Sequence, residues 1–435
     1  MRAVRMLLVI AILVIAGVGG FVLWSQRSEI PPVAPPKRAD FAPGLIDKGA
    51  QLAAIGNCVV CHTVPGGPAY AGGRPIPTPF GTLYSTNITP DPDTGIGGWS
   101  ETAFRRAMRE GIARDGRHLY PAFPYDHYTH TSDDDIQALY AFVMTRPAVS
   151  RRAQANALPF PVDQRRVLAA WNLLYLDQTP FRPDPNQSAE WNRGRYLVAA
   201  LGHCGDCHTP RNLLGAEKSG SVLSGGEAEG WSAPALNAAS PAPVPWDAAH
   251  LFTYLRQGWD SEHGGAAGPM QPIVAELAKA DESDVRAIAV YIAAQIGAAS
   301  PERRQQAGRL LAQVRAATQP EPPNPGEETG AAVFAGACAE CHIGGPGMAP
   351  PHGIDLRLST AIAEAGPRDA IFVILDGIRP SEGLPGPWMP RFDGAFTDAQ
   401  LAGLLAYLRA HYGHGPAWTD LEHRVHEIRQ SKERS

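Results

Sequence analysis

The sequence predicts a mainly α-helical chain that consists of three similar domains in series behind an N-terminal membrane anchor. Three observations support this prediction. A pentapeptide of the form C-x-x-C-H begins at residues 58, 204 and 338, and self-similarity at such a long period indicates an internal repeat. Amphipathic stretches with helical spacing flank each copy. An uninterrupted apolar run lies close to the N-terminus, and 435 residues suffice for about three domains.

Residues 1–30 are interpreted as a membrane anchor or signal segment, because Arg2 and Arg5 precede an apolar run over residues 6–24. As a helix this run would be about 28 Å long, close to the hydrocarbon thickness of a bilayer. A cleaved signal peptide is the alternative, but it would have a shorter core and a small-x-small cleavage site. An uncleaved anchor is therefore favoured. It places the rest of the chain on the periplasmic side of the cytoplasmic membrane.

Each predicted domain opens with an amphipathic stretch that leads into its motif, at residues 44–54, 190–198 and 328–334. One glycine of each stretch is expected to let another helix approach closely; these are Gly49, Gly194 and Gly330.

Each domain is expected to close with a second helix that has Asp or Thr near its start as an N-cap. These closing helices are predicted at residues 133–144, 281–294 and 397–411. An aromatic side chain at a matching position of each is expected to pack on the opening helix; these are Phe142, Tyr291 and Tyr407.

The remaining segments are read as linkers, because proline enrichment gives semi-rigid spacing. The expected order is a Pro-rich linker (31–43), a first domain (44–149), a linker (150–187), a second domain (188–300), a Pro-rich linker (301–326), a third domain (327–413) and a charged tail (414–435). Residues 171–175 of the second linker are too apolar for free solvent. We expect them to fold back on a domain or to contact a partner.

Each motif is the attachment signature of a c-type haem. Thiols at i and i+3 lie on one side of a helical turn, where each can bond to one vinyl group of the porphyrin. The adjacent histidine then supplies the proximal nitrogen ligand of the iron. The expected covalent ligands are Cys58, Cys61, Cys204, Cys207, Cys338 and Cys341, and the expected axial histidines are His62, His208 and His342. The chain is therefore expected to bind three haem c groups covalently.

Zinc binding and dithiol chemistry are the alternatives for a single C-x-x-C pair. Zinc sites need partner pairs within the same domain, whereas each pair here stands alone in its own segment. A redox dithiol would have a βαβ context, and the flanks here are helical and rich in Gly and Pro. All six cysteines of the chain belong to the three motifs, each with its trailing His, which favours haem.

A second axial ligand is expected from a methionine in a Pro-flanked loop before the closing helix, and Met/His ligation raises the reduction potential. Met270, in GPMQP, and Met389, in GPWMP, match this pattern. The first domain has Phe123 at the matching position, and Phe cannot ligate iron. His127, four residues further on, and Met108 are the leading candidates for this haem. His118, His130, another His or an open site are the alternatives.

With these residues laid out, the chain resembles the three-haem cytochrome c subunits of membrane-bound bacterial dehydrogenases. The segments 78–90, 120–125 and 202–212 carry the resemblance. It implies three class I cytochrome c domains that accept electrons from a catalytic subunit and pass them to ubiquinone or a respiratory electron carrier. That partner would be a quinoprotein, a flavoprotein or a molybdenum hydroxylase. The phrase FPYDHY at residues 123–128 looks most like cytochromes that accompany molybdenum hydroxylases oxidising aldehydes or N-heterocycles.

Other function classes are disfavoured by the sequence. The formal charge of −5 and the lack of a basic stripe exclude a general nucleic-acid binder. Neither paired carboxylates nor a nucleophile triad stands out, so catalysis is expected on a partner subunit. Two rivals stay open: a multihaem peroxidase, which the Phe123 position permits, and the electron-carrier subunit of a terminal oxidase.

Overall fold

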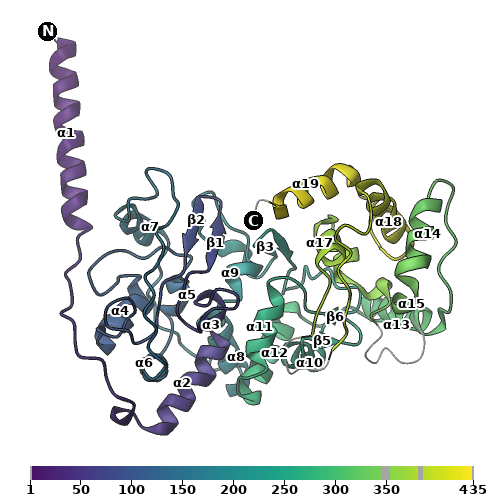
Figure 1. The fold of residues 1–435 in the computed structure, drawn as a ribbon, viewed down its shortest axis with the longest axis horizontal. Helices are drawn as coiled ribbons and strands as arrows, with labels where there is room; N and C mark the ends of the chain where they lie inside the picture. The colour runs from purple at the N-terminus through teal and green to yellow at the C-terminus, as the bar shows by residue number, and fades with distance from the viewer. Residues whose placement is uncertain (1, 344–352, 381–385, 434–435) are drawn as a thin grey trace. The chain divides into compact units, whose positions relative to one another are not determined.

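Helices make up most of the regular structure in the computed structural model, which describes residues 2–343, 353–380 and 386–433 (Figure 1). The chain forms two compact units. The first consists of Met1–Arg182 with Ala199–His203, and the second of Pro183–Val198 with Cys204–Ser435. Both later motifs lie in the second unit, so the division into three domains stays a prediction.

The first unit contains seven helices within its described residues. They are α1 (Arg2–Trp24), α2 (Pro43–Ile55), α3 (Cys58–Cys61), α4 (Glu101–Glu110), α5 (Tyr125–Tyr128), α6 (Asp133–Met144) and α7 (Val167–Tyr175), with a 3₁₀ turn at Arg38–Asp40. An antiparallel hairpin joins β1 (Pro75–Thr78) to β2 (Gly81–Tyr84), with Pro75 opposite Tyr84.

The second unit begins with α8 (Ala189–Ala199), whose last residue belongs to the first unit. Its other helices are α9 (Gly205–His208), α10 (Ala248–Gln257), α11 (Met270–Leu277), α12 (Glu282–Ile296), α13 (Pro301–Ala316), α14 (Glu328–Ala337), α15 (Ala339–His342), α16 (Thr360–Ala363), α17 (Arg368–Asp376), α18 (Asp398–His411) and α19 (Leu421–Glu433). Short 3₁₀ turns lie at Ser219–Ser221 and Leu356–Leu358. Two hairpins pair β3 (Gly226–Ala228) with β4 (Trp231–Ala233), and β5 (Trp259–Asp260) with β6 (Gly264–Gly265).

The predicted opening and closing helices pair as expected. A Cβ added to Gly49 of α2 would lie 2.7 Å from the Cβ of Phe142 on α6. The corresponding distances are 2.8 Å from Gly194 to Tyr291 and 2.8 Å from Gly330 to Tyr407. Only glycine allows two helices to approach this closely, so both the crossing positions and the aromatic positions are confirmed.

Capping residues explain where the closing helices begin. The side chains of Asp281 and Thr397 accept bonds from backbone N–H groups in the first turn of α12 and α18. In α6 this role falls to Ser132 instead of the expected aspartate.

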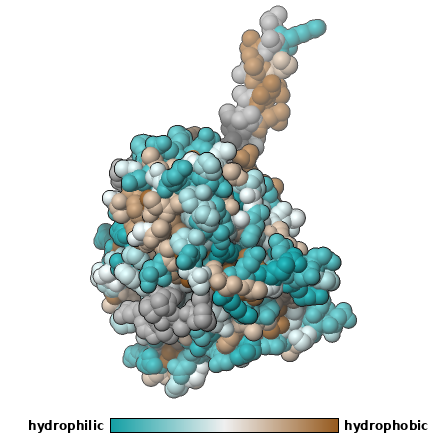
Figure 2. Space-filling view, turned by 90° about the vertical axis from the view of Figure 1, so that its right-hand side faces the viewer, coloured by the Kyte–Doolittle hydropathy of each residue, from teal (hydrophilic) through white to brown (hydrophobic). Residues whose placement is uncertain are grey.

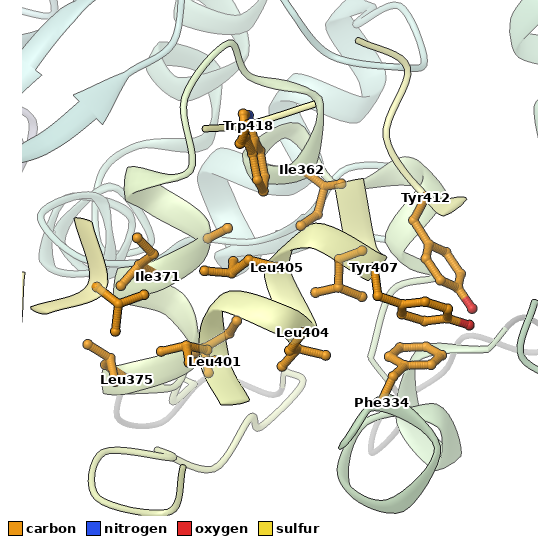
Figure 3. Close-up of a cluster of buried hydrophobic side chains, with 14 residues drawn as sticks. Phe334, Ile362, Ile371, Leu375, Leu401, Leu404, Leu405, Tyr407, Tyr412 and Trp418 are labelled. Carbon is orange, nitrogen blue, oxygen red and sulfur yellow. The ribbon is translucent and has the colours of Figure 1, made fainter. Parts of the chain in front are cut away.

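A continuous apolar core holds the last part of the chain together (Figure 3). Phe334 of α14 lies against Tyr407 of α18, and Leu401, Leu404 and Leu405 extend the contact along α18. The segment expected to be a charged tail also contributes to this core, because Val425 of α19 is fully buried in it.

The predicted linkers are more ordered than their composition suggests. Residues 171–175 do fold back within the first unit, where the indole of Trp171 packs on the ring of Tyr125 at 6.1 Å. Tyr125 also donates a hydrogen bond of 2.6 Å to the side-chain oxygen of Asn172. In the third linker, α13 is capped by Ser300 and buries Ala307, Leu310 and Val314 against Val244 and Leu358. That segment is therefore a packed helix where a spacer was expected.

The N-terminal apolar run is helical. Exposed apolar side chains lie along α1, including Met6, Leu13 and Leu23 (Figure 2). Among the described residues, no helix combines the length and apolar character that crossing a membrane requires. The expected anchor is thus not confirmed.

Candidate haem-binding sites

The three motifs adopt the same local structure. In each one the backbone N–H of the histidine donates to the backbone carbonyl of the first cysteine. The pairs are His62 with Cys58, His208 with Cys204 and His342 with Cys338, all at 3.0 Å. This i to i−4 bond closes a single helical turn. The turn brings the two thiols to one side, as double thioether attachment requires.

The imidazole of each motif histidine is oriented by a backbone carbonyl. Nδ1 lies 2.7 Å from the Thr86 oxygen for His62, 2.7 Å from Pro234 for His208 and 2.8 Å from Ile354 for His342. A carbonyl can only accept, so Nδ1 carries the proton and Nε2 keeps its lone pair. This arrangement fixes the tautomer and ring orientation that a metal-bound histidine needs.

The carbonyl acceptors of the first two sites lie just after small hairpins. Thr86 lies two residues after the end of β2, and Pro234 is the first residue after β4. A second bond ties the segment before each hairpin to its motif. The N–H of Gly72 donates to the His62 carbonyl at 2.7 Å, and that of Gly225 donates to the His208 carbonyl at 2.8 Å. The first two sites therefore share one construction, although their hairpins have little sequence in common.

Burial controls protonation at these sites. It lowers the pKa of His62, His208 and His342, with the carbonyl bonds acting in the opposite direction. The neutral imidazole is therefore favoured, and it is the form that can bind iron.

A solvent-open cavity lies beside the third motif, with an empty volume of about 780 Å³ that includes open solvent. Its walls include Cys338, Cys341, His342 and Met389. The structure therefore brings the predicted proximal and distal ligands of the third haem together. Met389 is fixed there by two backbone bonds with Ile378, of 2.8 and 3.0 Å.

Met270 is the first residue of α11, whereas a loop position was expected. The preceding Gly268 has φ +51° and packs on the indole of Trp231, since an added Cβ would lie 2.4 Å from its Cε2. This contact holds the turn that presents Met270. No described contact joins Met270 to His208, so its ligation stays a prediction.

The first site lacks an evident distal ligand among the residues that the structure describes. Phe123 packs on Tyr128, with ring centroids 5.3 Å apart, and Met108 is buried on α4. His127 points its Nδ1 at the Ala199 carbonyl, 2.8 Å away. His118 and His130 likewise lie 2.9 and 2.8 Å from backbone carbonyls. No described contact places any of these candidates against His62.

Sequence reasoning missed the residues that support the motifs. The acceptors Thr86, Pro234 and Ile354 act through their backbone carbonyls, which carry no side-chain signal. The hairpin of Trp259 also lines the third cavity, although Trp259 lies far from the third motif in the sequence. The only available signal was the apolar, Gly-rich character of these loops.

The donor set therefore fits haem. Each motif presents two thiols and a correctly oriented neutral imidazole from one helical turn, and the third adds an apolar cavity with a methionine. A structure with these sites defines a c-type cytochrome.

Comparison with known proteins supports this class. Residues 46–147 match the family model described as "Cytochrome c", and residues 325–408 match "Cytochrome C oxidase, cbb3-type, subunit III".

Relatives along most of the chain are cytochrome c subunits of dehydrogenase complexes. The fructose dehydrogenase cytochrome subunit of Gluconobacter japonicus is 34% identical, over 86% of this chain and 80% of that protein. The gluconate 2-dehydrogenase cytochrome c subunit of Pantoea cypripedii is 35% identical, over 89% and 90%. The chain belongs to this family of dehydrogenase cytochrome c subunits.

A further relative is a nicotinate dehydrogenase component of Pseudomonas putida, which is 47% identical over 93% of this chain. The chain spans only 33% of that protein's length.

Proposed function

We propose that this cytochrome holds three covalent haem c groups and carries electrons from a catalytic dehydrogenase subunit to ubiquinone or another respiratory carrier. The observation that carries the proposal is the threefold repetition of one turn, in which a carbonyl-oriented histidine stands next to two thiols. Catalysis takes place on the partner, because the described residues of this chain offer ligands and packing for haem.

A bound haem would supply one-electron chemistry between Fe(III) and Fe(II). The chain's own residues control where and at what potential this occurs. The cysteines would fix the haem position, and the carbonyl bonds orient each imidazole. Met389, which shares the third cavity with His342, would favour a high reduction potential as an iron ligand.

The partner that we propose is a molybdenum hydroxylase that oxidises an N-heterocycle such as a pyridine carboxylate. The support is the 47% identity to a protein named for nicotinate dehydrogenase, together with the FPYDHY sequence at residues 123–128. A quinoprotein or flavoprotein partner is the alternative, supported by the relatives of alcohol, fructose and gluconate dehydrogenases.

We further propose attachment to the periplasmic face of the cytoplasmic membrane through residues 6–24. The support is their uninterrupted apolar sequence after two arginines. Alkaline carbonate extraction compares the full chain with a variant that lacks residues 2–24. The full chain should stay with the membrane and the shortened chain should be released; equal release would contradict the attachment.

The decisive experiment is purification of the tagged full chain from its native membrane in mild detergent. We expect three haems per chain and a co-purifying large subunit with a molybdopterin. Adding an N-heterocyclic substrate to that complex should then reduce the haems. A chain that arrives without a dehydrogenase and decomposes peroxide would overturn the proposal in favour of a peroxidase. A copper- and haem-containing membrane partner would favour the terminal-oxidase rival.

A further inference from the structure

Two histidines and an aspartate come together in the second unit, outside the three motifs. His250 lies in the first turn of α10, Asp260 ends β5, and His263 lies in the turn between β5 and β6. Because α10 packs on β5 (Figure 1), one possible ligand atom of each residue lies within 4.8 Å of the other two. Two imidazoles and a carboxylate form a ligand set that suits divalent transition metals.

Both ring nitrogens of His263 face oxygen atoms that accept hydrogen bonds. Nδ1 lies 2.8 Å from Oδ1 of Asp260, and Nε2 lies 3.2 Å from the carbonyl oxygen of Val244. A neutral imidazole has only one N–H. When Nε2 donates its proton to Val244, the lone pair of Nδ1 therefore stands opposite a carboxylate oxygen. A cation is needed at that position, and it is either a second proton or a metal ion.

His250 favours the metal ion. Its Nδ1 is buried and has no hydrogen-bond partner among the described residues. The carboxylate oxygen Oδ1 of Asp247 is 3.6 Å away from this nitrogen, which is too far for a hydrogen bond. A second proton on His263 would satisfy the pair with Asp260 and leave His250 without a role. An ion bound by all three residues uses a lone pair from each.

The surroundings hold His263 in the orientation that a ligand needs. Its ring stacks on the indole of Trp246, with centroids 3.5 Å apart. The bond from Nε2 to the Val244 carbonyl is the outer-shell contact that metal-bound histidines usually make. The 2.8 Å between Nδ1 and Oδ1 of Asp260 also fits. Bonds of about 2.0–2.1 Å at a right angle place two neighbouring ligand atoms about 2.9 Å apart.

The charge at this place favours a divalent cation. Asp260 is only 4% exposed, and within the described parts of the chain no lysine or arginine forms an ion pair with it. Asp247 adds a second carboxylate next to His250. A buried carboxylate needs a positive partner. Ca²⁺ and Mg²⁺ prefer oxygen ligands, whereas the two imidazoles select an ion such as Zn²⁺.

We propose that His250, Asp260 and His263 bind one divalent transition-metal ion of the zinc type, in addition to the haem irons. The His250 side chain is 33% exposed, so water can complete the coordination. The ion joins the first turn of α10 to the β5–β6 hairpin. Asp260 and Gly264 of this hairpin also line the third cavity, so the ion fixes one wall of it. The site goes beyond the proposed electron transfer and does not depend on bound haem.

The test uses Zn²⁺ as the probe on the purified full-length cytochrome. EDTA first removes loosely held metal, while the covalently attached haem keeps its iron. Zn²⁺ is then added, the excess is removed by gel filtration, and plasma mass spectrometry counts zinc and iron in the same sample. We expect one zinc per chain. X-ray absorption at the zinc edge should show two imidazole ligands, a readout that needs no variant.

His250→Ala should weaken zinc binding in calorimetry about 100-fold or more, because even the outer-shell partners of a ligand are worth about 10–100-fold. His423→Ala is the matched control, since His423 on α19 is 71% exposed and outside the cluster; it should bind zinc like the wild type. A wild-type chain that retains no zinc would overturn the inference. So would a His250→Ala variant with unchanged affinity. Either result would mean that a proton occupies the position between His263 and Asp260. The iron count reports the haem content separately, so a failure of the proposed haem count is distinguishable.

Discussion

Gly194 of α8 lies directly against the carbonyl of Ala287 on α12, where an added Cβ would stand 1.9 Å from the carbonyl oxygen. The same relationship joins Gly49 to Ala138 at 2.0 Å and Gly330 to Gly403 at 2.2 Å. Each pair holds the helix before a haem motif against the helix that closes the repeat. The threefold repetition of the motif is thus matched by a threefold repetition of the helix crossing.

Gly194→Ala should destabilise the second unit, because the new methyl group forces the two helices apart. Overpacking of this kind costs about 1–3 kcal/mol. Thermal unfolding followed by haem absorbance measures the loss. Gly308→Ala on α13 is the matched control, since nothing lies within 4 Å of its added Cβ. That control should be neutral or stabilising by up to about 1 kcal/mol, and equal destabilisation of both variants would contradict the close crossing.

On the proposed three-haem function, Met389→Ala should leave the third haem five-coordinate, because Met389 shares its cavity with His342. We expect one of the three haems to become high-spin and to bind carbon monoxide in the reduced state. Electron paramagnetic resonance and carbon monoxide difference spectra measure this. Met144→Leu, on a buried methionine of α6, should leave all three haems unchanged. A low-spin third haem in Met389→Ala would show that another residue is the ligand.

Phe123→Met should give the first haem the axial pair expected of the other two. Phe123 occupies the position that corresponds to Met270 in the second repeat. Because Met/His ligation raises the reduction potential, the first haem should become easier to reduce in a potentiometric titration. His127→Ala and Met108→Leu, measured alongside, identify the wild-type ligand by loss of the low-spin signal. If Phe123→Met leaves the potential unchanged, the residue does not face the iron.

Glu364 should make the second unit less stable in alkaline solution. Burial and the nearby Asp369 raise the pKa of its carboxyl group to about 8. The folded state therefore holds a proton that the unfolded chain releases near its ordinary pKa of 4.5. By linkage, the stabilising contribution is fully present below about pH 4.5 and is lost as the pH rises through 8.

Glu364→Gln removes this pH dependence. The difference in unfolding free energy between the variant and the wild type should therefore shift by about 2 kcal/mol in favour of the variant from pH 5 to pH 9. Urea unfolding at both values measures the difference. Glu302→Gln is the control, because hydrogen bonds to its own backbone and from Ser300 lower the pKa of the exposed Glu302 carboxyl. It is therefore ionised at both values, and its replacement should leave the difference between pH 5 and pH 9 as it is. Parallel curves for wild type and Glu364→Gln would contradict the raised pKa.

Local sequence is sufficient to predict the motifs and the helices around them. Cysteine and histidine spacing predicts the turn of each motif, since a single i to i−4 bond forms it. Apolar periodicity predicts the bounds of the closing helices to within two residues of α6, α12 and α18. The crossing positions are predictable because glycine is the one residue type without a side chain. These features depend on residues that are close together in the chain.

The tertiary structure decided what surrounds the motifs. The carbonyls that orient His62, His208 and His342, the packing of α13 and α19, and the contribution of Trp259 to the third cavity all join segments that are distant in the sequence. A backbone carbonyl has the same chemistry at every residue, so its position cannot be inferred from residue type. Residue types and their spacing thus specify that the chain carries haem attachment sites, whereas the folded chain shows which groups orient and enclose each site.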